Sequence, residues 1–366
     1  MRMPLVSTVI TSYNYGCYIR EAIESVKKQS YRPLECIVVD DASSDDSVAI
    51  VQDFLKENPN TEELSFRLVQ MEKNSGQLAA FARGIKEAKG VFLNFLDADD
   101  VLFPEFVNTH VQVLLNANVG MSVSEQTIID RNSTFTSLTE DDPCPVYKNF
   151  YPLKVIESAS FFSEKVLSGQ LEDSEPCVYT LIRKNLFGAW LWAPTSNVVF
   201  RRDVLAFFDY SKVYEQWRIC ADGLIFNLVH YVSGSCHINR RLVAYRHHEN
   251  NNFFQRKSLG CCSVIPKKMR SMCGSSNSTG DSLFLIYLSS LEKMKGSSFE
   301  GNYFSRSVLH ILPALSLLFI FTKFPLWFSL LDKTSLITWL KLLFLPFAWW
   351  LVRLKKLSLL SFGKLS

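Results

Sequence analysis

Residues 1–120 alternate between short apolar runs and segments in which apolar residues recur at helical spacing. Strands are predicted at 5–11, 34–40, 66–71 and 91–96, and helices at 18–29, 47–56, 77–88 and 104–116. In the first of these helices, Ile19, Ile23 and Val26 form a single apolar stripe. Strands that alternate with helices are typical of an α/β fold with a doubly wound, mostly parallel sheet.

The fourth predicted strand leads directly into an acidic turn. Residues 91–96 are almost entirely apolar, as in a strand buried on both faces, and Asp97, Asp99 and Asp100 follow. Carboxylates this close repel one another unless a cation lies among them, and Mg²⁺ or Mn²⁺ suits such oxygen ligands. An ion held in this way commonly clamps a diphosphate. The alternative is a solvated acidic turn before the helix near Pro104.

The other three predicted strands also end in polar loops, and open α/β sheets bind ligands at this edge. Asp45 is expected to cap the helix that begins at Ser47. Either Asp40 or Asp41 can accept a hydrogen bond from a base or ribose. The candidate binding residues in the three loops are Thr11, Tyr13, Asp40, Asp41, Lys73 and Gly76.

The middle of the chain is less regular. A strand is predicted at 193–201, a helix at 221–232 and a strand at 242–246, with a surface loop at 140–148. Residues 255–282 are polar and predict a linker. We therefore expect a catalytic domain over 1–254, with halves at about 1–115 and 116–254, then a linker and helix over 255–299.

The last segment, 300–366, is expected to form membrane-associating helices. Residues 309–331 contain one lysine, and 335–352 include a Trp349-Trp350 pair followed by basic residues. Prolines, tryptophans and a basic flank in apolar segments indicate contact with a bilayer, by a spanning hairpin or by helices lying in the headgroup layer. The alternative is a helical subdomain buried against the globular part.

Composition narrows the class of protein. The net charge of +3 gives no general reason to expect a nucleic-acid partner. The nine cysteines are odd in number and none are spaced as Cys-x-x-Cys, which favours reduced thiols over disulfides or a zinc site. The start of the chain reads as a strand and not as a secretory signal, so the catalytic part is expected in the cytosol.

Four motifs together resemble family 2 glycosyltransferases of the GT-A fold. They lie at 9–14, 37–45, 74–81 and 95–100, in the order and spacing of that family. The resemblance implies a Rossmann-like nucleotide-binding half and a nucleoside diphosphate sugar as donor, with UDP favoured. It also implies that Asp99 binds the metal and that Asp97 faces the ribose or the outer shell of the ion. Asp40 or Asp41 would contact the base, and Thr11 and Tyr13 would line the same pocket.

The resemblance extends more loosely to residues 190–252. Asp222 is our candidate for the base that deprotonates the acceptor, although Ala221 replaces the acid that often precedes it and Asp222 can instead be a helix cap. His248 corresponds to a family histidine that completes the metal or diphosphate site, the alternative being a surface histidine pair. The loop at 193–197 falls where the family builds its acceptor side. Ala82 replaces a family asparagine that contacts the donor.

The sequence thus predicts an inverting, Mn²⁺- or Mg²⁺-dependent glycosyltransferase at the cytoplasmic face of the cell membrane. Its acceptor would be a lipid-linked glycan, as in surface-polysaccharide or glycolipid synthesis. The alternative is a non-catalytic, nucleotide-sugar-binding subunit of a membrane complex. Processive synthases usually carry a Gln-x-x-Arg-Trp-type acceptor motif after the base. Here Gln216-Trp217-Arg218 precedes Asp222, so a processive synthase is disfavoured. A nucleotidyltransferase is disfavoured because Ser12-Tyr13-Asn14 is not a glycine-rich phosphate loop.

Overall fold

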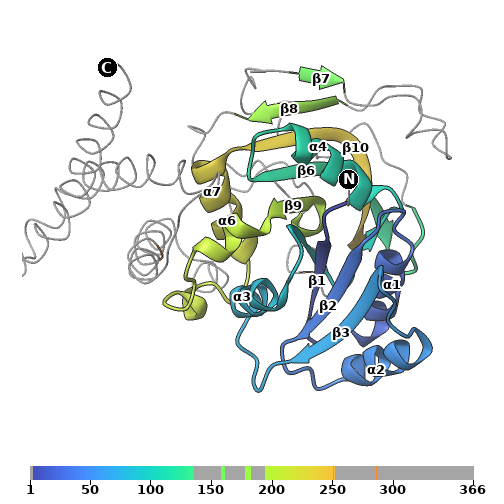
Figure 1. The fold of residues 1–366 in the computed structure, drawn as a ribbon. Coiled ribbons are helices and arrows are strands. Elements are labelled where there is room, and N and C mark those ends of the chain that lie inside the picture. The colour runs from blue at the N-terminus through green and yellow to red at the C-terminus, as the bar shows by residue number, and fades with distance from the viewer. Residues whose placement is uncertain are drawn as a thin grey trace, which may run out of the picture. The chain divides into compact units, whose positions relative to one another are not determined.

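In the computed structural model, the described residues are 3–135, 158–160, 178–182, 194–249, 251 and 286 (Figure 1). The chain divides into two compact units, Met1–Ser297 and Ser298–Ser366, and all described residues belong to the first. The loop expected at 140–148, the linker expected at 255–282 and the membrane-associating helices expected over 300–366 lie outside the described residues.

Four parallel strands form the N-terminal part of the sheet, in the order β3-β2-β1-β4. They are β1 (Val6–Ser12), β2 (Leu34–Asp40), β3 (Leu64–Gln70) and β4 (Phe92–Asp97). All four strands were predicted to within two residues. One detail of the prediction is wrong: Val91 is 52% exposed and lies before β4, because the buried part of this apolar run begins at Phe92.

Helices cover both faces of this part of the sheet, as expected for a doubly wound fold (Figure 1). The apolar stripe of α1 joins β1 and β2 in one core, together with residues of α2 and α4. On the opposite face, Phe81 of α3 stacks on Phe95 of β4 at 4.1 Å between ring centroids. The helices are α1 (Gly16–Lys27), α2 (Ser47–Glu57), α3 (Gln77–Glu87) and α4 (Phe106–Asn116).

Beyond β4 the sheet is mixed, in the order β4-β9-β6-β10-β8-β7, with β5 paired to β10. Only β6 and β10 are parallel here, so "mostly parallel" is correct for the N-terminal part alone. The strands are β5 (Val101–Leu102), β6 (Met121–Asp130), β7 (Ser158–Ser160), β8 (Val178–Ile182), β9 (Val198–Arg201) and β10 (Ser235–His247). The sequence did not predict β6, because buried polar residues such as Ser122 and Ser124 interrupt its apolar pattern.

The remaining elements are α6 (Arg202–Phe207), the 3-10 turns η1 (Thr195–Asn197) and η2 (Tyr214–Gln216), and α7 (Ala221–Ser233). The helix predicted at 221–232 is confirmed by α7, but the strand predicted at 193–201 begins only at Val198. Polar Thr195-Ser196-Asn197 forms η1 instead, and this turn lies against β4.

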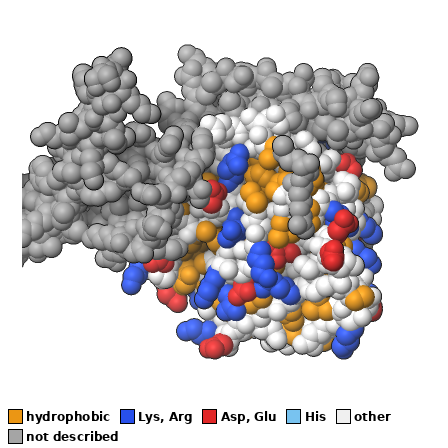
Figure 2. All heavy atoms as spheres, viewed as in Figure 1, with side chains coloured by type: hydrophobic (Ala, Val, Ile, Leu, Met, Phe, Trp, Pro, Cys, Tyr) orange, Lys and Arg blue, Asp and Glu red, His pale blue; other side chains and the backbone are white. Residues whose placement is uncertain are grey.

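The described surface carries charges of both signs. Figure 2 shows Lys and Arg side chains interspersed with Asp and Glu over the face that bears β2, β3 and α2. This mixture agrees with the small net charge of +3. Among the described helices, none has both the length and the apolar content that crossing a bilayer requires.

Candidate active site

The parallel register brings the polar loops after β1, β2 and β4 to one edge of the sheet. Ser12 lies beside Asp40, and Thr11 lies beside Asp97. Thr11 is half-buried and Tyr13 is 44% exposed, and both lie at this edge of the sheet.

Asp40 and Asp41 are both buried; Asp40 bonds within its own loop, and Asp41 connects this loop to the next one. Asp40 accepts hydrogen bonds from the N–H and the hydroxyl of Ser43, at 2.9 and 2.5 Å. Asp41 accepts the backbone N–H groups of Ser75 and Gly76, at 2.8 and 2.7 Å. Burial raises the pKa of Asp41, although these two donors act against that shift. The third loop, which also carries the exposed Lys73, is thereby fixed to the second.

The N-cap position of α2 belongs to Asp46, one residue after the position that the sequence predicted, but Asp45 still bonds the start of the helix. Its Oδ1 atom accepts the backbone N–H of Ser47, the first residue of α2, at 3.0 Å. Its Oδ2 atom accepts the N–H of Gly16 at 2.9 Å and thus also ties α2 to the start of α1.

Two non-glycine residues in these loops have left-handed backbones: Asn14 with φ 60° and Ala42 with φ 61°. Such conformations are uncommon outside glycine, and they persist where the surrounding contacts enforce them. Their position at one sheet edge is typical of a ligand site.

Asp100, the last carboxylate of the acidic turn, has a structural role. It is fully buried and accepts hydrogen bonds from the hydroxyl of Ser196, at 2.6 Å, and the N–H of Arg246, at 2.9 Å. Burial raises its pKa, and the charges of Asp99 and Asp97 add to this effect. Asp100 therefore joins the acidic turn to η1 and to β10.

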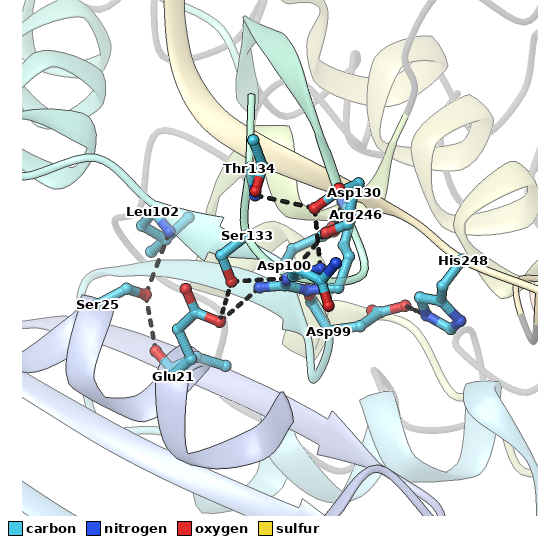
Figure 3. Close-up of polar contacts among 12 residues, drawn as sticks. Glu21, Ser25, Asp99, Asp100, Leu102, Asp130, Ser133, Thr134, Arg246 and His248 are labelled. Atoms are coloured by element: carbon cyan, nitrogen blue, oxygen red, sulfur yellow. Dashed lines mark hydrogen bonds and ion pairs between the residues drawn. The ribbon is translucent and has the colours of Figure 1, made fainter. Parts of the chain in front are cut away.

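The Asp99 side chain contacts His248, which lies 149 residues further along the chain (Figure 3). The Oδ2 atom of Asp99 lies 3.0 Å from Nε2 of His248 and 3.2 Å from Nδ2 of Asn251. His248 is buried, and its ring lies 4.9 Å from that of Tyr18. The alternative of a surface histidine is wrong, because the return of β10 beside β6 carries His248 inward.

Asp222 lies in the same group of side chains as the acidic turn. The hydroxyl of Thr195 donates to Oδ2 of Asp222 at 3.3 Å, and Thr195 also lies close to Asp97. Burial raises the pKa of Asp222 to about 6. Burial, with the charges of Asp99 and Asp222, raises the pKa of Asp97 well above its usual value.

Asp222 also satisfies part of the start of its helix. Its Oδ1 atom accepts the N–H of Gly223 at 2.9 Å, within the first turn of α7. The cap position itself belongs to Cys220. The second carboxylate oxygen is not used at the helix start and accepts the hydroxyl of Thr195.

A divalent cation would find two protein ligands here. Within the described residues, no group of three or more His, Cys, Asp or Glu side chains is arranged to hold a metal. Oδ2 of Asp99 and Nε2 of His248, 3.0 Å apart, nevertheless fit as adjacent ligands of one ion. Mg²⁺ is often held by one or two side chains, with substrate phosphates completing its coordination.

Several residues of the site were not predicted in these roles. The polar run before β9 signalled a loop but not its contacts with Asp97, Asp100 and Asp222. Glu21 lies on a helix and carries no signal in the sequence alone, and the motif at 74–81, which contains Gln77, gave no role for that side chain. The residues that sequence reasoning missed are Glu21, Gln77, Thr195, Ser196, Arg246 and Asn251.

Comparisons with known proteins give the family. The family model described as "Glycosyl transferase family 2" matches residues 7–205. An uncharacterized glycosyltransferase of Nostoc sp. is 30% identical over 254 residues, which are 69% of this chain and 68% of that protein. The chain belongs to glycosyltransferase family 2, and the predicted enzyme class is confirmed.

Other relatives match over shorter segments. The putative teichuronic acid biosynthesis glycosyltransferase TuaG of Bacillus subtilis is 29% identical, over 36% of this chain and 50% of its own length. The GalNAc(5)-diNAcBac-PP-undecaprenol beta-1,3-glucosyltransferase of Campylobacter jejuni is 34% identical, over 32% and 36%. The structure of S. aureus TarS 1-349 in complex with UDP superposes with a TM-score of 0.48 at 14% identity, covering 91% of this chain and 77% of that one.

Proposed function

We propose that this protein is an inverting glycosyltransferase that uses a divalent cation and moves a sugar from a UDP-sugar to an acceptor hydroxyl. One observation carries the proposal: Asp222, which accepts a hydrogen bond from Thr195, lies close enough to Asp97 for their charges to interact, and Asp97 belongs to the acidic turn whose Asp99 contacts His248. Direct displacement at an anomeric carbon requires a general base on the face opposite the departing diphosphate, so both groups must line one site.

Asp222 is the group we assign to the acceptor proton. A base works best when its pKa lies near the operating pH, and burial raises the pKa of Asp222 to about 6. Asp222 takes the proton of the acceptor hydroxyl as the new bond to the anomeric carbon forms and the bond to the diphosphate breaks. Displacement in one step inverts the anomeric configuration.

Asp99 and His248 are the residues we assign to Mn²⁺ or Mg²⁺. When bound, the ion supplies charge stabilisation for the departing diphosphate. Open α/β folds bind nucleotides at the carboxyl edge of the sheet. We assign the nucleoside to the residues at this edge, which are Asp40, Asp41, Thr11 and Tyr13. Asp97, between the two groups, is assigned to the ribose or the outer shell of the ion.

A lipid-linked glycan is the acceptor class we propose. The name of the Campylobacter relative specifies an undecaprenol diphosphate-linked acceptor, and that of the Bacillus relative specifies teichuronic acid synthesis. Both fit assembly of a surface polysaccharide. The apolar sequence of 300–366 adds a reason to propose the cytoplasmic face of the membrane as the place of reaction.

The proposal is tested by thermal shift with UDP-, GDP-, dTDP- and CDP-sugars, each with Mn²⁺ and with EDTA. A bound ligand stabilises the folded state according to its concentration relative to Kd. We expect a shift with UDP-sugars that requires Mn²⁺ and is lost in Asp99→Asn. The exposed Asp53, which pairs with Lys56, gives the matched control Asp53→Asn, and it should behave as wild type.

The alternative is a non-catalytic nucleotide-sugar-binding subunit. It is favoured by Ala221, which stands where an acid often precedes the base and is fully buried. Hydrolysis or transfer of the donor sugar that is lost in Asp222→Asn would exclude this alternative. Donor binding with no turnover in wild type would support it.

Membrane attachment through 300–366 needs its own test. The full chain should sediment with vesicles of anionic phospholipid, and a chain that ends at Ser297, the last residue of the first unit, should remain in the supernatant. Equal sedimentation of both chains contradicts the proposal.

A further inference from the structure

Arg246 is the most extensively bonded buried cation in the described part of the chain. Its side chain is 1% exposed and donates four hydrogen bonds to three different segments. An arginine so deeply buried needs this density of partners, because an uncompensated buried charge is costly.

The contacts of Arg246 converge on the acidic turn. Its Nε donates to the backbone carbonyl of Asp99 at 2.7 Å, and its backbone N–H donates to the carboxylate of Asp100 at 2.9 Å. Figure 3 shows Asp99 between Arg246 and His248, with the Asp99 carboxylate directed toward the imidazole. Arg246 thus fixes the backbone from which this carboxylate projects.

His248 and Arg246 also contact the same aromatic ring. The guanidinium lies 4.8 Å from the ring centroid of Tyr18, and the His248 ring lies 4.9 Å from the same ring. Arg246 is two residues from His248 in the chain, so the two side chains share one aromatic partner at the end of β10.

Glu21 holds Arg246 from the side of α1. Its Oε2 atom accepts from Nη2 of Arg246 at 2.6 Å and from the hydroxyl of Ser133 at 2.8 Å. The Ser133 hydroxyl in turn accepts from Nη1 of Arg246 at 2.8 Å. Nη1 also donates to the carbonyl of Asp130 at 3.1 Å. The guanidinium is therefore held in one orientation by Glu21, Ser133 and Asp130.

We propose that Arg246, held by Glu21, is a positioning residue that sets the Asp99 carboxylate and the His248 imidazole at the spacing a divalent cation needs. This inference rests on the proposed function, since it assumes that Asp99 and His248 are the protein's ligands. Residues that orient metal ligands typically change metal affinity by about 10- to 100-fold when they are replaced.

The test measures Mn²⁺ binding to the full chain in the absence of donor. The EPR signal of the free ion reports how much Mn²⁺ remains unbound. We expect Arg246→Lys to raise the Kd for Mn²⁺ by about 10- to 100-fold, because lysine cannot reproduce the fork of donors to Asp99, Asp130 and Glu21. Glu21→Gln keeps an acceptor for Nη2 but loses the charge, so its increase should be smaller, about 2- to 10-fold.

Matched controls separate positioning from folding. Glu57→Gln removes the partner of the half-exposed Arg20 at the surface and should leave the Kd within about 2-fold of wild type. Each Kd is measured below the thermal midpoint of its own variant, so that unfolded protein does not mimic weak binding. If Arg246→Lys does not fold, Glu21→Gln decides the question.

Two outcomes overturn different statements. Wild-type affinity in both Arg246→Lys and Glu21→Gln, with binding lost in Asp99→Asn, overturns the positioning role and leaves the metal assignment intact. No binding by wild type, or equal binding by wild type and Asp99→Asn, overturns the metal assignment and the positioning role with it.

Discussion

The side-chain carbonyl of Gln77 accepts the backbone N–H of Ala221 at 2.8 Å, across 144 residues of sequence. Ala221 is the first residue of α7, so Gln77 satisfies one of the N–H groups that the start of a helix leaves without a partner. Gln77 also donates its own N–H to the carbonyl of Arg218 at 2.8 Å. The nucleotide-side loop and the helix that carries Asp222 are thus joined at Gln77.

Gln77→Leu should lower kcat for sugar transfer while the KM for donor changes little. The substitution removes the acceptor for Ala221, at a cost of about 1 kcal/mol as for other lost caps, and frees the start of α7 that positions Asp222. Because small misplacements of a reacting group are costly, we expect kcat to fall at least about 10-fold. Steady-state kinetics check this, with Gln52→Leu on the exposed side of α2 as control. Equal kcat values in the two variants would contradict the role of Gln77.

Asp222→Asn should abolish transfer and keep donor binding. Removing a general base typically costs about 10²- to 10⁴-fold in rate. In wild type, the base acts only when ionised, and burial raises the pKa of Asp222 to about 6. The rate should therefore increase with pH below about 6 and reach a plateau above it. A profile of kcat against pH that is flat from 5 to 8 would argue against Asp222 as the base.

Thr195→Val should move that profile to higher pH. The Thr195 hydroxyl hydrogen-bonds the Asp222 carboxylate and opposes the larger effect of burial, which raises the pKa. Without the hydroxyl, protonated Asp222 is favoured further, so the midpoint of the kcat profile should rise. Thr109→Val replaces another buried threonine, on α4, and should leave the midpoint unchanged. A midpoint that falls, or stays, in Thr195→Val would show that the hydroxyl does not stabilise the ionised base.

Gly76→Ala should destabilise the protein by about 1–3 kcal/mol and weaken donor binding. Gly76 has φ +88°, and an added Cβ would lie 2.6 Å from the Cα atom of Arg218. Strain and clash together would displace the N–H groups that Asp41 accepts. Denaturant unfolding and donor titration measure the two effects. Ser75→Ala is the control, since the Ser75 hydroxyl donates only to the carbonyl of Lys73 at 3.2 Å and its N–H remains.

The N-terminal part of the fold was predictable because its signals are local. The apolar residues of a strand and of a helix recur at different spacings, and here each pattern is short and separate from the next. The sequence therefore placed β1 to β4 and α1 to α4 to within two residues. Two of these strands end at Asp40 and Asp97, and Asp41 and Asp99 follow within two residues. Their meeting at one edge follows from the parallel order alone.

The second half was less predictable because its strands pair far from their neighbours in sequence. β9 lies between β4 and β6, and β10 returns beside β6. Strand β10 begins at Ser235, but polar residues interrupt the apolar pattern between Ser235 and Arg241. This part of the sequence therefore does not show that it forms one strand with Leu242–His247. The partners of Arg246 and Thr195 depend on this topology, so their roles required the folded chain.

The insertion of β9 beside β4 has a consequence for synthesis of the protein. β4 is complete at Asp97, yet the strand that covers its free edge is not made until Val198–Arg201. At ordinary translation rates this interval lasts on the order of 5–20 s. Throughout it, the apolar N-terminal sheet presents an unpaired edge, the kind of surface that pairs with other chains. The nascent chain should therefore be most prone to aggregation, and most dependent on chaperones, between these two strands.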